Sequence, residues 1–259
     1  MPGSGLSSGG RFRILALMPD SLEPSASPRR ASPVKLARRN VRGRRQLGGP
    51  LSAEVVTQAT REDILRAATA EFARAGFAAA SVEAIAARTR ASKRMVYYHF
   101  GGKLALYEAV LEAAYTRVRR VDPPGDPAAD PMAALRQYAQ SGVDHFMANP
   151  DFVRLVLYEN LAGAPVVRRN KVIAAISAGN LQSLQAIVEA GQRAGCMRPD
   201  LSVSDLFLTV VGMSFHAVSN RETVRASMGV DMLGAQGTAR RRELVAELVS
   251  RYAAAVPEA

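Results

Sequence analysis

The chain has 259 residues, of which 48% are hydrophobic, and this is enough for one large domain or two small ones with a buried core. Its formal net charge of +11 favours a polyanionic partner such as nucleic acid, because binding to phosphates releases their counterions. The single cysteine, Cys196, excludes an intramolecular disulfide and a cysteine-based metal cluster. No apolar stretch approaches the ~18–20 residues that span a bilayer. The composition therefore predicts a soluble, cytoplasmic protein with no membrane partner.

Residues 1–55 are rich in Gly, Ser, Pro and Arg and show no apolar periodicity, so we expect them to be disordered. They hold ten Lys or Arg and three acidic residues, and most of the net charge therefore lies in this segment. Two interpretations stay open: a basic arm that contacts DNA, or an unselected extension that reflects a start codon placed too early. Charge alone does not establish DNA binding.

Helical periodicity begins at Thr60, where the segment 60–63 has the form of a capping box. Ile64, Ala68 and Phe72 recur at helical spacing and predict one apolar face. Gly76 is expected to end this helix, because glycine favours the left-handed conformation of a C-cap.

Two short helices are predicted next, each preceded by a serine that can cap it. Ser81 precedes a helix over 82–88, and Ser92 precedes a helix over 93–100 that Gly101 and Gly102 end. Periodicity then predicts helices over 103–121 and, beyond a proline-rich linker at 122–131, near 132–148, 151–162, 166–194, 202–219 and 239–255. No strand-period pattern competes, so the fold class is all-α.

Two short helices joined by a tight turn have the outline of a helix-turn-helix. The first would pack its apolar side on the preceding helix and hold the second so that its N-terminal half enters a major groove of DNA. We therefore predict a three-helix DNA-binding domain over 56–105 and a larger helical domain over 106–259.

Residues 60–107 resemble the N-terminal domain of the TetR family of repressors, above all in the string SKRMVYYHFGGK that runs from Ser92 to Lys103. The resemblance implies three DNA-binding helices, a connecting fourth helix, and a variable domain that binds a ligand and dimerises. It also implies a homodimer on a palindromic, double-stranded operator, a small-molecule effector, and no cofactor or metal.

The resemblance assigns roles within the motif. Phosphate contacts are implied for Ser81, Ser92, Tyr97, His99 and Lys103, where a helix N-terminus adds attraction for an anion. Tyr98 matches a residue near the DNA backbone or a thymine methyl group. Base reading is implied for Lys93 and Arg94.

Arg94 departs from many relatives, which have glycine there. An arginine could bind guanine O6 and N7 in a bidentate way, which is worth ~1–3 kcal/mol of discrimination. It could equally bind phosphate or lie clear of the DNA, and the three alternatives stay open.

The larger domain resembles more diffusely one branch of the family, which includes regulators of aromatic and nitrogen-heterocycle breakdown. The similar stretches are 149–155, 158–160, 197–200 and 219–221. A pocket between helices would be mostly apolar with a few polar anchors, which suits an apolar or aromatic effector. Candidate lining residues are Tyr138, His145, Phe146, Tyr158, Glu159, Asn160, Met213 and His216. Tyr138 and Phe146 also suit the core, and Glu159 also suits an ion pair with Arg154 or a helix cap.

Two apolar stripes on the last long helices predict a dimer interface built as a four-helix arrangement about a two-fold axis. The residues expected there are Leu206, Val210, Met213, Leu244, Leu248 and Tyr252. The alternative is that both stripes face the core of their own subunit.

The alternatives to a ligand-responsive, nucleoid-associated repressor are an enzyme and a DNA-binding protein without sequence specificity. An enzyme is disfavoured because the sequence has no HExxH, no GxSxG and no glycine-rich phosphate loop, so no catalytic residue is predicted. A binder without sequence specificity would use the basic N-terminal segment, and competition with bulk DNA would distinguish it.

Overall fold

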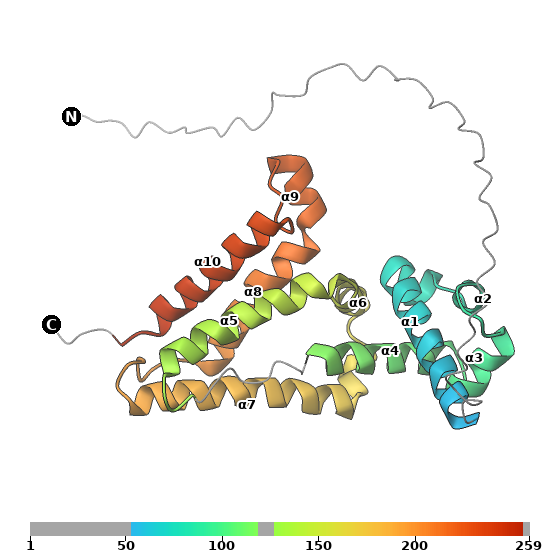
Figure 1. The fold of residues 1–259 in the computed structure, drawn as a ribbon, viewed down its shortest axis with the longest axis horizontal. Helices are drawn as coiled ribbons and strands as arrows, with labels where there is room; N and C mark the ends of the chain where they lie inside the picture. The colour runs from blue at the N-terminus through green and yellow to red at the C-terminus, as the bar shows by residue number, and fades with distance from the viewer. Residues whose placement is uncertain (1–52, 119–126, 256–259) are drawn as a thin grey trace, which may run out of the picture. The chain divides into compact units, whose positions relative to one another are not determined.

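We analysed a computed structural model of the chain, which describes residues 53–118 and 127–255. Its regular elements in these ranges are helices, and an isolated antiparallel bridge joins Met197 to Ala254. The all-α prediction is confirmed for this part of the chain. The helices are α1 Ala53–Ala79, α2 Val82–Ala87, α3 Lys93–Phe100, α4 Lys103–Val118, α5 Pro131–Ala148, α6 Pro150–Leu161, α7 Lys171–Arg193, α8 Val203–Ser219, α9 Arg221–Met228 and α10 Ala235–Ala253, with the 3₁₀ turn Val167–Arg169 before α7 (Figure 1).

Side-chain caps fix where several helices begin. Ser81 and Ser92 accept hydrogen bonds from the backbone N–H groups of Ala84 and Met95, as their positions before two short helices predicted. Asp130, Asn170 and Ser202 cap α5, α7 and α8 in the same way. Short helices have few internal hydrogen bonds, so these caps help to define the helix-turn-helix.

The first helix begins earlier than the sequence pattern suggested. Thr60 lies inside α1, which starts at Ala53, so the capping-box prediction was wrong and residues 53–55 are helical. No glycine or proline lies between Pro50 and Gly76, and nothing in the sequence stops the helix from extending. Gly76 breaks the helical path with φ 72° and ψ 170°, a positive φ that glycine adopts without a Cβ clash.

Other boundaries differ in smaller ways. The predicted helix over 166–194 begins only at Lys171, because Val167–Arg169 forms a separate 3₁₀ turn. Gly179 lies within α7 without ending it. Helix α9 was not predicted, since its eight residues hold few apolar side chains and none of them is buried. The N-terminal segment 1–52 and the linker residues 119–126 lie outside the described residues.

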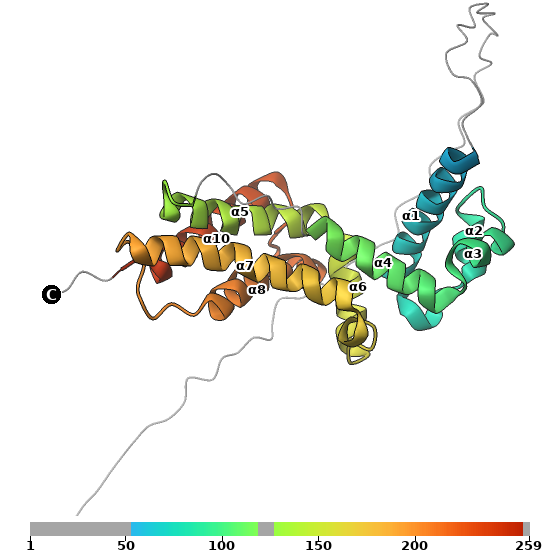
Figure 2. The ribbon, with the colours of Figure 1, turned by 90° about the horizontal axis from the view of Figure 1, so that it is seen from below.

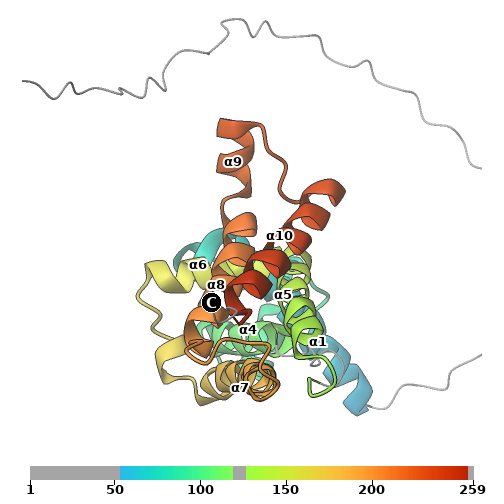
Figure 3. The same cartoon turned by 90° about the vertical axis from the view of Figure 1, so that its left-hand side faces the viewer.

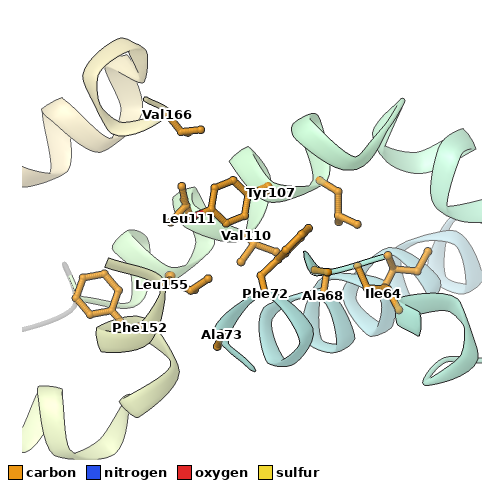
Figure 4. Close-up of a cluster of buried hydrophobic side chains, with 14 of the residues drawn as sticks. Ile64, Ala68, Phe72, Ala73, Tyr107, Val110, Leu111, Phe152, Leu155 and Val166 are labelled. Carbon is orange, nitrogen blue, oxygen red and sulfur yellow. The ribbon is translucent and has the colours of Figure 1, made fainter. Parts of the chain in front are cut away.

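One hydrophobic core joins α1 to α4 and α6. Ile64, Ala68 and Phe72 are fully buried along α1, as their spacing predicted. They face Tyr107 and Val110 of α4, and the same core continues to Phe152 and Leu155 of α6 (Figure 4). The rings of Phe72 and Tyr107 meet edge to face at 4.9 Å. Helix α1, on which the helix-turn-helix is built, therefore packs against both α4 and α6.

A second core lies among α5, α7, α8 and α10, which run alongside one another (Figures 1 and 2). Leu135, Leu184 and Leu206 are fully buried there, and Val245 and Val249 bring the inner face of α10 against α5. Helix α9 differs from these, because none of its side chains is buried, and it projects beside the ends of α8 and α10 (Figure 3). Among the described residues, no helix combines the length and apolar character needed to cross a membrane.

Candidate DNA-binding surface and effector cavity

Helix α3 separates its buried and exposed residues sharply. Val96 and Phe100 are buried against the first core, and Ser81-capped α2 packs beside them through Val82 and Ile85. The opposite side of α3 is in solvent. The exposed residues are the cap Ser92 and, on the helix, Lys93, Arg94, Met95, Tyr97 and Tyr98, of which Tyr98 is 76% exposed. Several large side chains left exposed together on one short helix, here Met95, Tyr97 and Tyr98, are typical of a binding surface.

Lys93 is held by a neighbour from α2. Its Nζ donates to Glu83 Oε1, and the same ammonium lies 6.0 Å from the centre of the Tyr97 ring. The hydrogen bond and the opposite charge of Glu83 raise the pKa of Lys93 and keep it cationic. Both groups are exposed, so the pair can open when a phosphate competes for the ammonium.

Two other motif residues are less open than the resemblance implied. His99 is half-buried, and its Nε2 is buried without a hydrogen-bond partner in the described part of the chain. Lys103 donates from Nζ to the carbonyl oxygen of Ala78 and lies 4.8 Å above the Phe77 ring. Lys103 therefore ties the start of α4 to the end of α1.

A buried carboxylate fixes α2 on α1. Glu71 is 1% exposed, accepts from Arg74 at 2.8 Å and 3.1 Å, and pairs with Arg88 at 3.4 Å. The hydrogen bond from Arg74 holds the pKa of Glu71 below its usual value, against the effect of burial. Because Arg88 caps the end of α2, this network sets the position of α2, and α2 in turn supports α3.

Helix α6 connects to both α1 and α4. The Tyr158 hydroxyl donates to the carbonyl oxygen of Arg74 at 3.3 Å. A Cβ added to Gly76 would stand only 2.8 Å from the Tyr158 ring. Glu159 is buried and accepts from the backbone N–H groups of Val166 and Val167 at 3.2 Å and 3.3 Å. Burial, followed by the charge of Glu159 and a hydrogen bond to it, raises the pKa of Tyr107 on α4.

A cavity of about 260 Å³ lies among α4, α5, α6, α7 and α8. Three of the candidate ligand residues line it, namely Tyr138, His145 and Phe146. The remaining wall comes from Tyr115, Gly142, Phe152, Val156, Ser177, Asn180, Ser183, Phe207, Val210, Val211 and Phe215. Burial raises the pKa of Tyr138 to about 12, so its hydroxyl stays protonated.

Five candidate ligand residues do not reach this cavity. Adjacent helix positions diverge by ~100°, so Tyr158 faces α1, Glu159 faces the 3₁₀ turn and α4, and Asn160 is exposed. Met213 packs on the second core, and His216 is exposed. These five residues lie outside this cavity. The sequence could not show this, because a sequence motif does not reveal which face of α6 or α8 points inward.

The lining residues that were not predicted have no distinctive signal in the sequence, because each looks like an ordinary buried or exposed residue of its own helix. Phe152, Phe207 and Phe215 read as apolar stripe residues, and Ser177, Asn180 and Ser183 read as the polar side of α7. The available signal was the spacing of three residues between Ser177, Asn180 and Ser183, because it places small polar side chains next to one another on successive turns of α7.

The predicted dimer stripes split between core and surface. Leu206 and Val210 are buried within their own subunit, so they cannot form an interface, and the alternative interpretation holds for them. Leu244, Leu248 and Tyr252 are exposed on α10, and Met213 is half-buried. Leu208, which was not selected, is 63% exposed on α8. The inner stripe was mistaken for the outer one because α8 carries apolar residues on both faces.

This arrangement of α1–α4 defines a helix-turn-helix protein with a helical second domain. Residues 64–110 match the family described as bacterial regulatory proteins, tetR family, and residues 131–249 match a tetracyclin repressor-like C-terminal domain. The chain is 31% identical to the HTH-type transcriptional repressor NicS of Pseudomonas putida, over 74% of this chain and 91% of that protein. The chain therefore belongs to the TetR family of bacterial regulatory proteins.

Further relatives agree in sequence and fold. The HTH-type transcriptional repressor SCO4008 of Streptomyces coelicolor is 28% identical over 70% of this chain and 89% of its own. The crystal structure of SCO4942 from the same species has a TM-score of 0.58 at 30% identity, covering 76% of this chain and 99% of that one. A TetR regulator from Chloroflexus aurantiacus, at 19% identity, shares the fold with a TM-score of 0.59 over 78% and 100% of the two chains.

Proposed function

We propose that the chain is a ligand-responsive repressor that binds a palindromic operator as a homodimer and releases it when an effector occupies the cavity. The observation that carries the proposal is the solvent-facing row of Ser92, Lys93, Arg94, Tyr97 and Tyr98 on a capped, rigidly packed α3. Repressor names among the relatives support the sign of regulation.

DNA is recognised through α3. Tyr98 and Arg94 are free to reach base edges or the sugar–phosphate backbone, and Lys93 can exchange Glu83 for a phosphate. Ser92 caps the N-terminus of α3, and the first turn of this helix is the part that would enter the groove. In a two-fold dimer, two such helices would lie about one helical turn of DNA apart, ~34 Å.

The second copy would dock on the outer face of α8 and α10. Leu208, Leu244, Leu248 and Tyr252 make an exposed apolar set on these neighbouring helices. Helix α9 has Met228 at 70% exposure and no buried side chain, and an eight-residue helix has little stability by itself. A partner subunit packed on this side would cover both features.

The effector signal would reach the DNA-binding helices through α6 and α4. Phe152 and Val156 of α6 and Tyr115 of α4 line the cavity, while Tyr158 and Glu159 of α6 contact α1 and Tyr107 of α4. A ligand that displaces α6 or α4 would thereby change the separation of the two α3 helices. Couplings of this kind are typically ~1–3 kcal/mol.

The function is tested by selecting DNA from a pool of randomised duplexes with the purified protein. We expect an enriched inverted repeat, and we expect anisotropy to show that this duplex stays bound in excess bulk DNA at moderate salt. Selection that yields no common sequence, or binding that bulk DNA removes completely, would contradict a specific regulator.

Leu248→Asp is expected to convert the dimer to a monomer and to weaken operator binding by at least tenfold, because it places a charge in the apolar contact of α10. Light scattering after size exclusion measures the mass, and anisotropy measures the affinity. Leu161→Asp is the matched control, since Leu161 is exposed at the end of α6 and away from that face. A Leu248→Asp protein that remains dimeric would refute this interface.

A further inference from the structure

The effector cavity has an aromatic side and a polar side. Six phenylalanine and tyrosine rings from four helices line it, and several meet edge to face, as Tyr115 with Phe152 at 5.1 Å and Phe146 with Phe215 at 5.9 Å. Edge-to-face walls favour a flat guest, which can stack on one ring and meet the edge of another. Ser177, Asn180 and Ser183 of α7 contribute the polar groups.

The size of the cavity limits its guest. An engineered cavity of about 150 Å³ holds one benzene molecule, so a cavity of about 260 Å³ suits a molecule of one or two rings. Gly142 keeps the space open on the side of α8, because a Cβ there would stand 3.0 Å from Val210 Cγ1.

No Asp, Glu, Lys or Arg lines the cavity among the residues that the structure describes. The titratable groups in the wall are Tyr115, Tyr138 and His145, and burial favours the neutral form of all three. A carboxylate guest would therefore lose hydration without meeting a cation on a lining side chain, and the nearby charge that reaches Tyr115 is the Glu159 carboxylate, which would repel it. An ammonium group would likewise meet no charged side chain in the wall itself.

The tautomer of His145 follows from its neighbour. Asn149 Nδ2 lies 2.8 Å from the His145 carbonyl oxygen, which can only accept, so this atom is the amide nitrogen. The same nitrogen lies 3.4 Å from His145 Nδ1, and because an amide nitrogen cannot accept, a hydrogen bond between them requires Nδ1 to be the acceptor. In a neutral ring the proton then lies on Nε2, which has no exposed surface and no partner among the described residues. A guest would reach this atom by turning the imidazole or displacing the Phe146 and Phe152 rings that pack against it.

We propose that the cavity binds an uncharged aromatic molecule of one or two rings that presents a hydrogen-bond acceptor to His145 Nε2–H. An amide, ketone, lactam or phenol oxygen has this chemistry, and further polar groups of the guest would face Ser177 and Asn180. The proposal rests on the proposed function for its regulatory consequence, but the binding itself can be measured without DNA.

The test compares matched probes on the full-length protein by calorimetry and thermal shift. The probes are benzamide, 1- and 2-naphthamide and 2-quinolone, beside benzoate and 1- and 2-naphthoate. We expect at least one neutral probe to bind with a Kd below about 1 mM. Its carboxylate counterpart should bind about tenfold more weakly or not at all. Carboxylates that bind as well as the amides, or neutral probes that all fail, would overturn the proposal.

His145→Leu keeps much of the side-chain volume and removes the donor. We expect it to weaken the bound amide about fivefold, the loss of one neutral hydrogen bond, and to change the affinity for naphthalene less, because naphthalene has no acceptor for the lost donor. Equal losses for both molecules would mean that His145 only shapes the wall. A variant that does not fold leaves the amide and carboxylate comparison on the native protein as the test. Probes that bind while no specific DNA is selected would contradict the proposed function and not the ligand class.

Discussion

Lys93→Ala is expected to weaken operator binding about 100-fold. Each subunit loses one charged contact, about 1.4 kcal/mol, and a symmetric dimer loses two of them. Glu83 adds to the loss, because its carboxylate would face the DNA phosphates without the ammonium that now accompanies it. The logarithm of the binding constant should also depend less steeply on the logarithm of the salt concentration, by about 2 for the dimer.

Fluorescence anisotropy over a range of salt concentrations measures both effects. Lys171→Ala is the matched control, since Lys171 is an exposed lysine at the start of α7. Glu83→Gln should act in the opposite direction and strengthen binding, because it frees Lys93 before DNA arrives. A Lys93→Ala protein whose operator affinity stays within twofold of the native value would remove α3 from the proposed interface.

Gly76→Ala is expected to lower the free energy of unfolding by about 3 kcal/mol, which corresponds to a fall in Tm of ~6–12 °C for a chain of this size. Two causes combine. The φ of 72° with ψ of 170° lies in a region that side chains rarely adopt, and the new Cβ would stand 2.8 Å from the Tyr158 ring.

Thermal unfolding followed by circular dichroism measures the fall. Gly229→Ala is the comparison without a clash, because nothing lies within 4 Å of a new Cβ there. Gly229, with φ 68° and ψ 12°, lies in the left-handed helical region, where an alanine costs less than at the φ and ψ of Gly76. It should cost about 1 kcal/mol. If the two alanine variants lose equal stability, the contact between Gly76 and Tyr158 does not constrain α6 on α1.

The DNA-binding half of the molecule could be predicted closely from the sequence because its signals are local. A serine cap, a short apolar pattern and a glycine stop lie within a few residues of one another, and they placed α3 at Lys93–Phe100 as observed. The start of α1 was missed because nothing local marks it; the helix simply continues back to Ala53.

The second domain was harder because its site depends on long-range packing. Of the candidate lining residues, Tyr138, His145 and Phe146 lie on α5 and line the cavity. For Tyr158, Glu159 and Asn160 the choice of inward face depends on where α1 and α4 pack, which no spacing along α6 reveals. Leu206 and Leu208 show the same problem on α8, where two apolar faces compete for core and surface.

The carboxylate of Glu159 stiffens the corner that follows α6. Its two backbone hydrogen bonds clamp the chain at Val166 and Val167, and its contact with Tyr107 fastens that corner to α4. A flexible loop at this point would change its conformation when α6 is displaced, and α4 would then not move with α6. With this corner held rigid, a displacement of α6 is transmitted to α4. We expect Glu159→Ala to bind both its ligand and its operator, but to lose the coupling by which ligand binding weakens operator binding.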